Sequence, residues 1–273
     1  MNSSDSQDYF GLAGKVCVVT GAGSGIGRAI AIGFAAHGAR VAVLDRDAAG
    51  GQATVDAITA RGGMALAIAC DVADPASVTA AAESSAAAFG PCDVLVNNAG
   101  VLRPGLLTDL SLNDWNGMLA VNLTGGFLCS QAFGRQMRSK GKGAIVHMAS
   151  IAATYAAASG GAYSVAKAGV AMLSRQLAIE WAEHGIRSNA VNPGLIQTPM
   201  TEAAYARPGT AERRNQAIPA GRVGQPEDIA QAVLFLAGER SAYMTGAELT
   251  VDGGFTRNLL SLVPRAAPER PAV

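Results

Sequence analysis

The chain has 273 residues, enough for one large domain or two small ones, and 49% of them are hydrophobic while 15% are charged, so a sizeable core can form. Lys and Arg together number 21, as do Asp and Glu, which gives a formal net charge of +0. This balance argues against nucleic acid and acidic membranes as partners, because both require a basic surface.

The start of the chain carries no sign of export. Residues 1–10 are polar and lack the basic and apolar regions of a secretory signal, and no apolar run reaches the roughly 18 residues that span a bilayer. The cysteines show neither a CxxC pair nor metal-ligand spacing, so we expect reduced thiols, no metal and a cytoplasmic location. They are Cys17, Cys70, Cys92 and Cys129.

Short apolar runs alternate with helical patterns through the first half of the chain. Strands are expected at 15–20, 40–45, 65–70 and 93–96. Helices are expected between them, near 26–37, 48–61 and 76–89. Because the strand runs are continuously apolar rather than alternating, they indicate a parallel sheet that is covered by helices on both faces.

The alternation continues in the second half. Strands are expected at 144–148, 187–191 and 247–251, and helices near 114–138, 163–184 and 226–237. His147 lies in one of these apolar strands and is expected to be a core histidine. A chain that alternates strand and helix throughout forms a doubly wound α/β sheet, so we predict a single Rossmann-fold domain over residues 1–273, with a core of about 12–254.

Two segments depart from the alternation. Residues 199–222 are rich in Pro and Gly, and we expect an irregular lid there, at the carboxyl edge of the sheet. The tail, 255–273, contains Pro264, Pro268 and Pro271, and we expect it to be partly disordered. Its stretch 258–263 is too apolar for a fully solvated end, so we expect this stretch to dock near a subunit interface or a neighbouring active-site mouth.

A glycine-rich loop follows the first strand and opens the first helix. Gly21 permits a sharp turn, Gly25 lets the backbone approach a phosphate, and Gly27 lets the helix pack tightly on the strand. With Ser24 and Ile26, these residues place free N–H groups and the positive end of the helix dipole toward a pyrophosphate. The loop therefore predicts a dinucleotide site, although its spacing differs from the general GxGxxG pattern.

The ends of the next strands supply further cofactor contacts. Asp45 lies 20 residues after Gly25, the usual offset for the acid that binds the adenosine ribose, so it favours NAD over NADP. The adjacent Arg46 is the residue that could accept a 2′-phosphate instead. The remaining candidates at the strand ends are Asp71 and Val72 beside the adenine, and Asn98, Ala99 and Gly100 along the cofactor.

A hydroxyl, a phenol and an ammonium make up the candidate catalytic group. Tyr163 and Lys167 are four residues apart on a predicted helix and therefore share a face, and Ser150 precedes this helix. A phenol has a pKa of about 10, and we expect the ammonium to lower it. Tyr163 would then take the proton of an alcohol as hydride leaves carbon, while Ser150 holds the oxygen.

Together these residues resemble the classical short-chain dehydrogenases/reductases over about residues 12–254. The resemblance implies a seven-stranded sheet, an NAD(P)(H) cofactor and a homotetramer or homodimer, of which we expect the homotetramer. It also implies that Lys167 binds the nicotinamide ribose and that Asn122 holds a water linking Lys167 to solvent. A last segment is implied to contact the nicotinamide carboxamide and the phosphates: Pro193, Gly194, Ile196 and Thr198.

The favoured function is an NAD-dependent oxidoreductase of a secondary alcohol or its ketone, and two alternatives stay open. An NADPH-dependent 3-oxoacyl-thioester reductase usually carries a basic residue in the glycine loop or after the second strand, where this chain has Ser24 and Asp45. A non-catalytic NAD-binding regulatory protein would be expected to have lost Tyr163 or Lys167.

The substrate pocket is expected to be formed by residues 151–161 and by the lid. Both are rich in Ala, and they contribute Tyr155, Met200 and Tyr205. No arginine in them is obviously aimed at the site to bind a carboxylate. This composition favours a neutral or apolar substrate and leaves polyols and sugars open.

Overall fold

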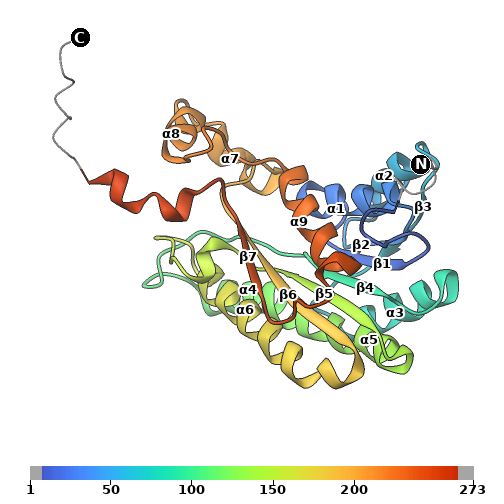
Figure 1. The fold of residues 1–273 in the computed structure, drawn as a ribbon. Coiled ribbons are helices and arrows are strands. Elements are labelled where there is room, and N and C mark those ends of the chain that lie inside the picture. The colour runs from blue at the N-terminus through green and yellow to red at the C-terminus, as the bar shows by residue number, and fades with distance from the viewer. Residues whose placement is uncertain (1–7, 264–273) are drawn as a thin grey trace, which may run out of the picture.

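The computed structural model describes residues 8–263 and contains one seven-stranded sheet, in the order β3-β2-β1-β4-β5-β6-β7 (Figure 1). All neighbouring strands are parallel. The strands are β1 (Val16–Thr20), β2 (Arg40–Asp45), β3 (Met64–Ala69), β4 (Val94–Asn97), β5 (Gly143–Met148), β6 (Ile186–Pro193) and β7 (Glu248–Val251). The predicted doubly wound seven-stranded Rossmann sheet is therefore confirmed.

Helices cover both faces of this sheet (Figure 1). The core on one face joins the sheet to α1 (Gly25–Ala36), α2 (Ala48–Thr59) and α9 (Pro226–Ala237). The core on the other face joins it to α3 (Pro75–Phe89) and α5 (Gly125–Lys140), and α6 (Tyr163–Glu180) packs beside β6. The two-sided cover explains why the central strands read as continuous apolar runs.

The edge strands differ from the central ones. Every residue of β1 is buried, whereas β3 and β7 keep residues that are half-buried or exposed, such as Met64 and Glu248. Each edge strand has a neighbouring strand on one side only. All four cysteines are free and buried, as expected. His147 is also fully buried, as expected for a core histidine.

The long helix expected over 114–138 is interrupted. It consists of α4 (Leu112–Leu119), a π-helical turn at Ala120–Thr124 and α5. Asn122 lies in this turn, where its Oδ1 accepts from the N–H of Val101 at 2.7 Å and its Nδ2 donates to the Val101 carbonyl at 2.9 Å. A π-turn inserts one extra residue into a helix, which a periodic pattern does not reveal.

The lid is helical rather than irregular. It contains a 3-10 turn at Pro199–Thr201, α7 (Glu202–Tyr205) and α8 (Thr210–Ala217). The prolines and glycines separate these helices instead of preventing them: Pro199 begins the first turn, and Gly209 precedes α8 with a φ of 72°. The described chain ends after two further turns, Phe255–Arg257 and Leu259–Leu262, so the prolines of the tail lie outside it.

None of the helices in residues 8–263 combines the length and apolarity that a bilayer crossing requires. Within the same residues, no cluster of three or more His, Cys, Asp or Glu side chains could hold a metal ion.

Candidate active site

A large cleft opens at the carboxyl ends of the strands, where the order of the sheet reverses between β1 and β4. Such a switch point is where open α/β sheets bind ligands. The cleft has a volume of about 1200 Å³. This exceeds the roughly 300–1,000 Å³ of an ordinary small-molecule pocket, so one cleft can take a dinucleotide together with a substrate.

Nearly all residues predicted for the site line this cleft. Gly27 and Asn122 are the two that do not. The lining residues that the sequence predicted are Gly21, Ser24, Gly25, Ile26, Asp45, Arg46, Asp71, Val72, Asn98, Ala99, Gly100, Ser150, Tyr163, Lys167, Pro193, Gly194, Ile196 and Thr198.

The glycine loop requires its glycines for two different reasons. Gly21 has a φ of 63°, and a Cβ there would lie 2.8 Å from the Cα of Ala99. Gly27 lies beneath the loop, where a Cβ would come within 2.2 Å of the Gly21 carbonyl oxygen. The side chain of Ser24 makes no capping hydrogen bond, so the first N–H groups of α1 can bind a diphosphate.

Side chains from neighbouring strand ends hold the loop in place. Asp45 Oδ2 accepts from the N–H of Gly23 at 2.7 Å. Asn98 Nδ2 donates to the carbonyls of Thr20 at 2.9 Å and Gly21 at 3.0 Å. Asp45 therefore shapes the loop in addition to its predicted contact with a ribose, and the Asn98 amide is used by the protein itself.

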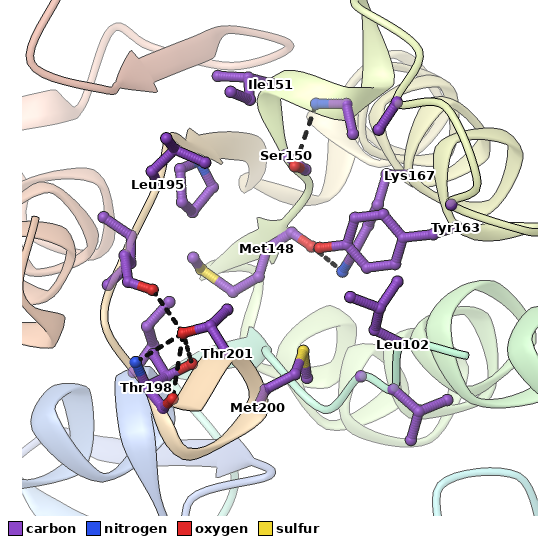
Figure 2. Close-up of a pocket in the computed structure, with 18 of the residues that line it drawn as sticks. Leu102, Met148, Ser150, Ile151, Tyr163, Lys167, Leu195, Thr198, Met200 and Thr201 are labelled. Atoms are coloured by element: carbon purple, nitrogen blue, oxygen red, sulfur yellow. Dashed lines mark hydrogen bonds between the residues drawn. The ribbon is translucent and has the colours of Figure 1, made fainter. Parts of the chain in front are cut away.

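The candidate catalytic residues come from the end of β5 and the start of α6. Figure 2 shows the Tyr163 ring beside Lys167, with Ser150 close to both. The ammonium of Lys167 lies 5.5 Å from the centroid of the Tyr163 ring and donates to the Met148 carbonyl at 2.7 Å. Ser150 Oγ accepts from the N–H of Ala152 at 3.1 Å, which leaves its own O–H free to donate to a substrate oxygen.

The electrostatics of this group correct one expectation. Burial raises the pKa of the Tyr163 phenol, and the neighbouring Ser150 hydroxyl opposes this shift only in part. The net shift of the Tyr163 pKa in the protein is therefore upward, opposite to the direction that the sequence suggested. Burial lowers the pKa of Lys167 itself to about 8. The protein alone therefore keeps the phenol protonated at neutral pH, ready to donate to a carbonyl oxygen.

A second, much smaller cavity of about 10 Å³ lies beneath the π-turn and is lined by Asn97, Asn122 and His147, among others. It has room for about one water. Asn97 Nδ2 lies 3.3 Å from His147 Nδ1, while Asn97 Oδ1 and His147 Nε2 have no hydrogen-bond partner among residues 8–263. Burial, and secondarily the Lys167 charge, lower the pKa of His147 to about 3, so this histidine is neutral.

The substrate side of the cleft contains residues that sequence reasoning missed. Leu102 and Leu195, which lie on opposite sides of the pocket in Figure 2, give it apolar walls in addition to the predicted Met200. Arg207 and Arg214 of the lid also line the cleft, which corrects the expectation that no arginine is aimed at the site. Tyr205 does not line it but lies under the Arg214 guanidinium, 4.5 Å from the carbon at its centre. In the sequence, only their position within the lid segment pointed to Arg207 and Arg214.

The tail also reaches the cleft. Phe255, Thr256, Asn258 and Leu259 are among its lining residues, and Asn258 Nδ2 donates to the Ala217 carbonyl of α8 at 3.1 Å. The start of the stretch 258–263 thus lies at the cleft of its own chain, whereas the sequence suggested a subunit interface or a neighbouring active-site mouth.

Comparisons with known proteins agree with this geometry. A family model described as Enoyl-(Acyl carrier protein) reductase matches residues 21–256. The chain is 46% identical over 247 residues to D-threitol dehydrogenase of Mycolicibacterium smegmatis, which covers 90% of this chain and 95% of that protein. It is 42% identical over 254 residues to galactitol 2-dehydrogenase (L-tagatose-forming) of Cereibacter sphaeroides, which covers 92% of this chain and 99% of that protein.

Solved structures show the same similarity. A crystal structure of gluconate 5-dehydrogenase from Burkholderia cenocepacia J2315, in complex with NADP and tartrate, matches with a TM-score of 0.87 and 34% sequence identity. The match covers 92% of this chain and 98% of that one. A short-chain type dehydrogenase/reductase from Mycobacterium marinum matches with a TM-score of 0.87 and 36% identity, over 91% of this chain and 98% of that one.

Proposed function

The chain belongs to the classical short-chain dehydrogenase/reductase family and is an oxidoreductase of CH–OH groups, and we propose that it is an NAD-dependent dehydrogenase of a secondary alcohol in a polyhydroxylated small molecule. One observation carries the proposal. Ser150, Tyr163 and Lys167 line the same cleft as the glycine loop and Asp45, so proton transfer and dinucleotide binding meet in one place.

In this proposal each side chain has a separate role. When bound, a nicotinamide dinucleotide supplies the hydride acceptor for the alcohol or the hydride donor for the ketone. Tyr163 takes the hydroxyl proton of the alcohol, or returns it to the ketone oxygen. The Ser150 hydroxyl donates to the same oxygen as charge develops there, and the buried Lys167 ammonium favours the phenolate over the phenol.

The preference for NAD rests on Asp45. Its carboxylate lies at the end of β2 and lines the cleft, where ribose hydroxyls can donate to it and a 2′-phosphate would be repelled. Arg46 also lines the cleft and is exposed. A structural relative binds NADP, so the direct comparison of both cofactors is part of the test.

The substrate class draws on the relatives and on the polar groups of the cleft. The two relatives named above act on threitol and galactitol, both open-chain polyols. In this chain Ser159, Thr256 and Asn258 line the substrate side and can bond to additional hydroxyls. An NADPH-dependent reductase of 3-oxoacyl thioesters is the second candidate. The matching family model, described as Enoyl-(Acyl carrier protein) reductase, shares with it only the acyl carrier protein, because an enoyl reductase acts on a carbon–carbon double bond.

A single assay tests these proposals. NADH formation is followed at 340 nm with threitol, galactitol and simple secondary alcohols, and the same reactions are repeated with NADP. The proposal expects turnover of at least one polyol, with NAD the better cofactor. Turnover of 3-oxoacyl thioesters with NADPH alone would favour the second candidate, and binding of NAD without any turnover would favour a regulatory protein.

The proposal also includes a homotetramer. The apolar side chains Val165, Met172 and Ile179 are exposed on α6 at intervals of seven residues, and Phe127 is exposed on α5. Residues seven apart lie on the same face of a helix, so α6 has an uncovered apolar stripe that a second subunit could bury. Light scattering at micromolar concentration tests this, and a monomeric mass would contradict it.

We place the enzyme in the cytoplasm because its cysteines are all free.

A further inference from the structure

The charged residues that line the cleft fall into two groups. Asp45, Arg46 and Asp71 lie at the ends of β2 and β3, in the half that we assign to the adenosine part of the cofactor. Lys167, Arg207 and Arg214 are the other charged lining residues, and all three are basic. Among residues 8–263, no acidic side chain lines the substrate half of the cleft.

The two lid arginines also lack acidic partners. Neither Arg207 nor Arg214 forms an ion pair with any carboxylate in the part of the chain that the structure describes. By contrast, Arg222 at the far end of the lid binds Asp228 through two hydrogen bonds of 2.7 Å and does not line the cleft. Both lid arginines that line the cleft therefore lack a carboxylate partner among the described residues; Arg213 of α8 also has no such ion pair but does not line the cleft.

The helix that carries Arg214 is held in place from several sides. Its carboxyl end accepts the amide of Asn258, and Asn215 Oδ1 accepts from the N–H of Val223 at 2.8 Å. Ile218, which ends the helix, is buried. The Arg214 guanidinium also stacks on Tyr205, which restricts its orientation. Arg214 is thus positioned by the fold rather than free in solvent.

The other lining residues of the substrate half of the cleft are largely apolar. Apolar residues, including Leu102, Ile151 and Met200, surround the pocket around Ser150 and Tyr163 (Figure 2). Positive charge in a cleft with apolar walls focuses the electric field and attracts an anion more strongly than the same charge on an open surface. A guanidinium also matches a carboxylate geometrically, through two parallel hydrogen bonds.

We propose that Arg207 and Arg214 form an anion subsite that binds a carboxylate at the end of the substrate remote from the reacting carbon. The substrate class is then a hydroxy-acid anion, such as an aldonate, rather than a neutral polyol. This inference rests on the proposed function, because it assigns the reacting carbon to the Ser150 and Tyr163 end. The hydride and proton transfers remain those already described.

Matched pairs of substrates test the subsite. Threitol and threonate share four carbons, and galactitol and galactonate share six, so each pair differs only in a terminal CH2OH or carboxylate. We expect the acid of at least one pair to have a KM about tenfold below that of its polyol, because hydrogen bonds to charged groups are the stronger ones. Raising the ionic strength should weaken this advantage. Equal KM values within both pairs would overturn the proposal.

Variants of the lid arginines identify the residues responsible. Arg207→Gln and Arg214→Gln should each raise the KM of the acid about tenfold with little change in kcat, and leave the KM of NAD within twofold. Arg214→Lys should recover part of the loss. The control is Arg213→Gln, which alters the adjacent arginine of α8 that does not line the cleft. Equal effects of the three Gln variants, or an effect on NAD alone, would overturn the subsite.

A binding measurement separates this inference from the proposed function. Quenching or enhancement of NADH fluorescence gives the Kd of threonate or galactonate for the enzyme–NADH complex without any turnover. If no polyol or acid is oxidised but Arg214→Gln still weakens binding of the acid about tenfold, the proposed function fails and the anion subsite stands. If polyols are oxidised and Arg214→Gln leaves acid binding unchanged, the function stands and the subsite fails.

Discussion

At the glycine-loop half of the cleft, side chains at the ends of three strands hold the main chain, whereas the lid half is built from short helices beyond the sheet. Thr20 Oγ1 accepts from two N–H groups after β4, Asp45 holds Gly23, and Asn98 holds the loop carbonyls. On the lid, Met200 is 50% exposed, and the Asn258 amide joins the tail to α8. Strand ends therefore shape the sheet half, while helices and the tail shape the lid half.

This difference predicts how substitutions divide between the two halves. Changes at the sheet half and its catalytic residues should act on kcat, cofactor choice and stability. Changes at the lid and tail should act mainly on KM, because these segments contact the substrate without forming the reacting groups.

The largest effect is expected for Tyr163→Phe, which removes the proton carrier and preserves the ring. We expect kcat to fall by about 10² or more, in line with general acid–base catalysis, while the Kd of NAD stays within twofold. Steady-state kinetics and NADH fluorescence measure the two quantities. Tyr243→Phe, at a fully exposed tyrosine, is the control. Retention of more than a tenth of the activity would mean that another group carries the proton.

Buried His147, beneath the sheet half of the cleft, should make the stability of the protein fall in acid. The pKa of His147 is lowered to about 3, whereas an unfolded histidine has a pKa of about 6.5. Between these values the unfolded state binds more protons than the folded state, so stability is present above pH 6.5 and is lost as pH falls. Between pH 7 and pH 5 the loss should be about 2 kcal/mol of unfolding free energy.

Urea unfolding at pH 7, 6 and 5 measures this loss. His147→Asn should remove most of the dependence of the unfolding free energy on pH. The variant will also differ in stability at pH 7. His184→Asn, at a partly exposed histidine, should keep the wild-type slope. Identical slopes in all three proteins would show that His147 is not the titrating group.

The raised pKa of Tyr163 predicts opposite pH dependences for the two directions of reaction. Oxidation needs the phenolate, so its kcat/KM should rise by about tenfold per pH unit below the pKa of the phenol. Reduction needs the phenol and should decline as pH passes through the same value. Initial rates in both directions between pH 6 and pH 10 test this. An oxidation rate already at its plateau at pH 6 would contradict the raised pKa.

Asp45→Asn should shift the choice of cofactor. The amide keeps an oxygen for the N–H of Gly23 but removes the negative charge, so the loop is retained and the repulsion of a 2′-phosphate is lost. We expect the preference for NAD over NADP in kcat/KM to narrow by about tenfold, about 1.4 kcal/mol. Asp47→Asn, which keeps the cap of α2, should leave the preference unchanged. A wild-type preference for NADP would refute the assignment of Asp45.

The same division explains what the sequence could predict. Gly27 and Asp45 belong to the sheet half, where strand ends fix their positions, so their spacing along the chain was enough to place them. The π-turn at Ala120–Thr124 was missed because one inserted residue barely alters a hydrophobic pattern. Arg214 was missed because its direction depends on how α8 packs on Tyr205 and the tail, which local sequence does not encode.

The smallest effect is expected where the tail meets the lid. Asn258→Ala removes the hydrogen bond to the Ala217 carbonyl, which lies in a partly exposed position. A hydrogen bond of this kind contributes about 0.5–1.5 kcal/mol, so KM for the substrate should rise by roughly two- to tenfold. Because the reacting groups and the glycine loop are untouched, kcat and the KM of NAD should change less than twofold. Thr79→Ala, at an exposed residue of α3 whose hydroxyl bonds to the Pro75 carbonyl of the same helix, is the control. If Asn258→Ala instead lowers kcat as strongly as it raises KM, the lid helps to form the reacting geometry, and the division between the two halves does not hold.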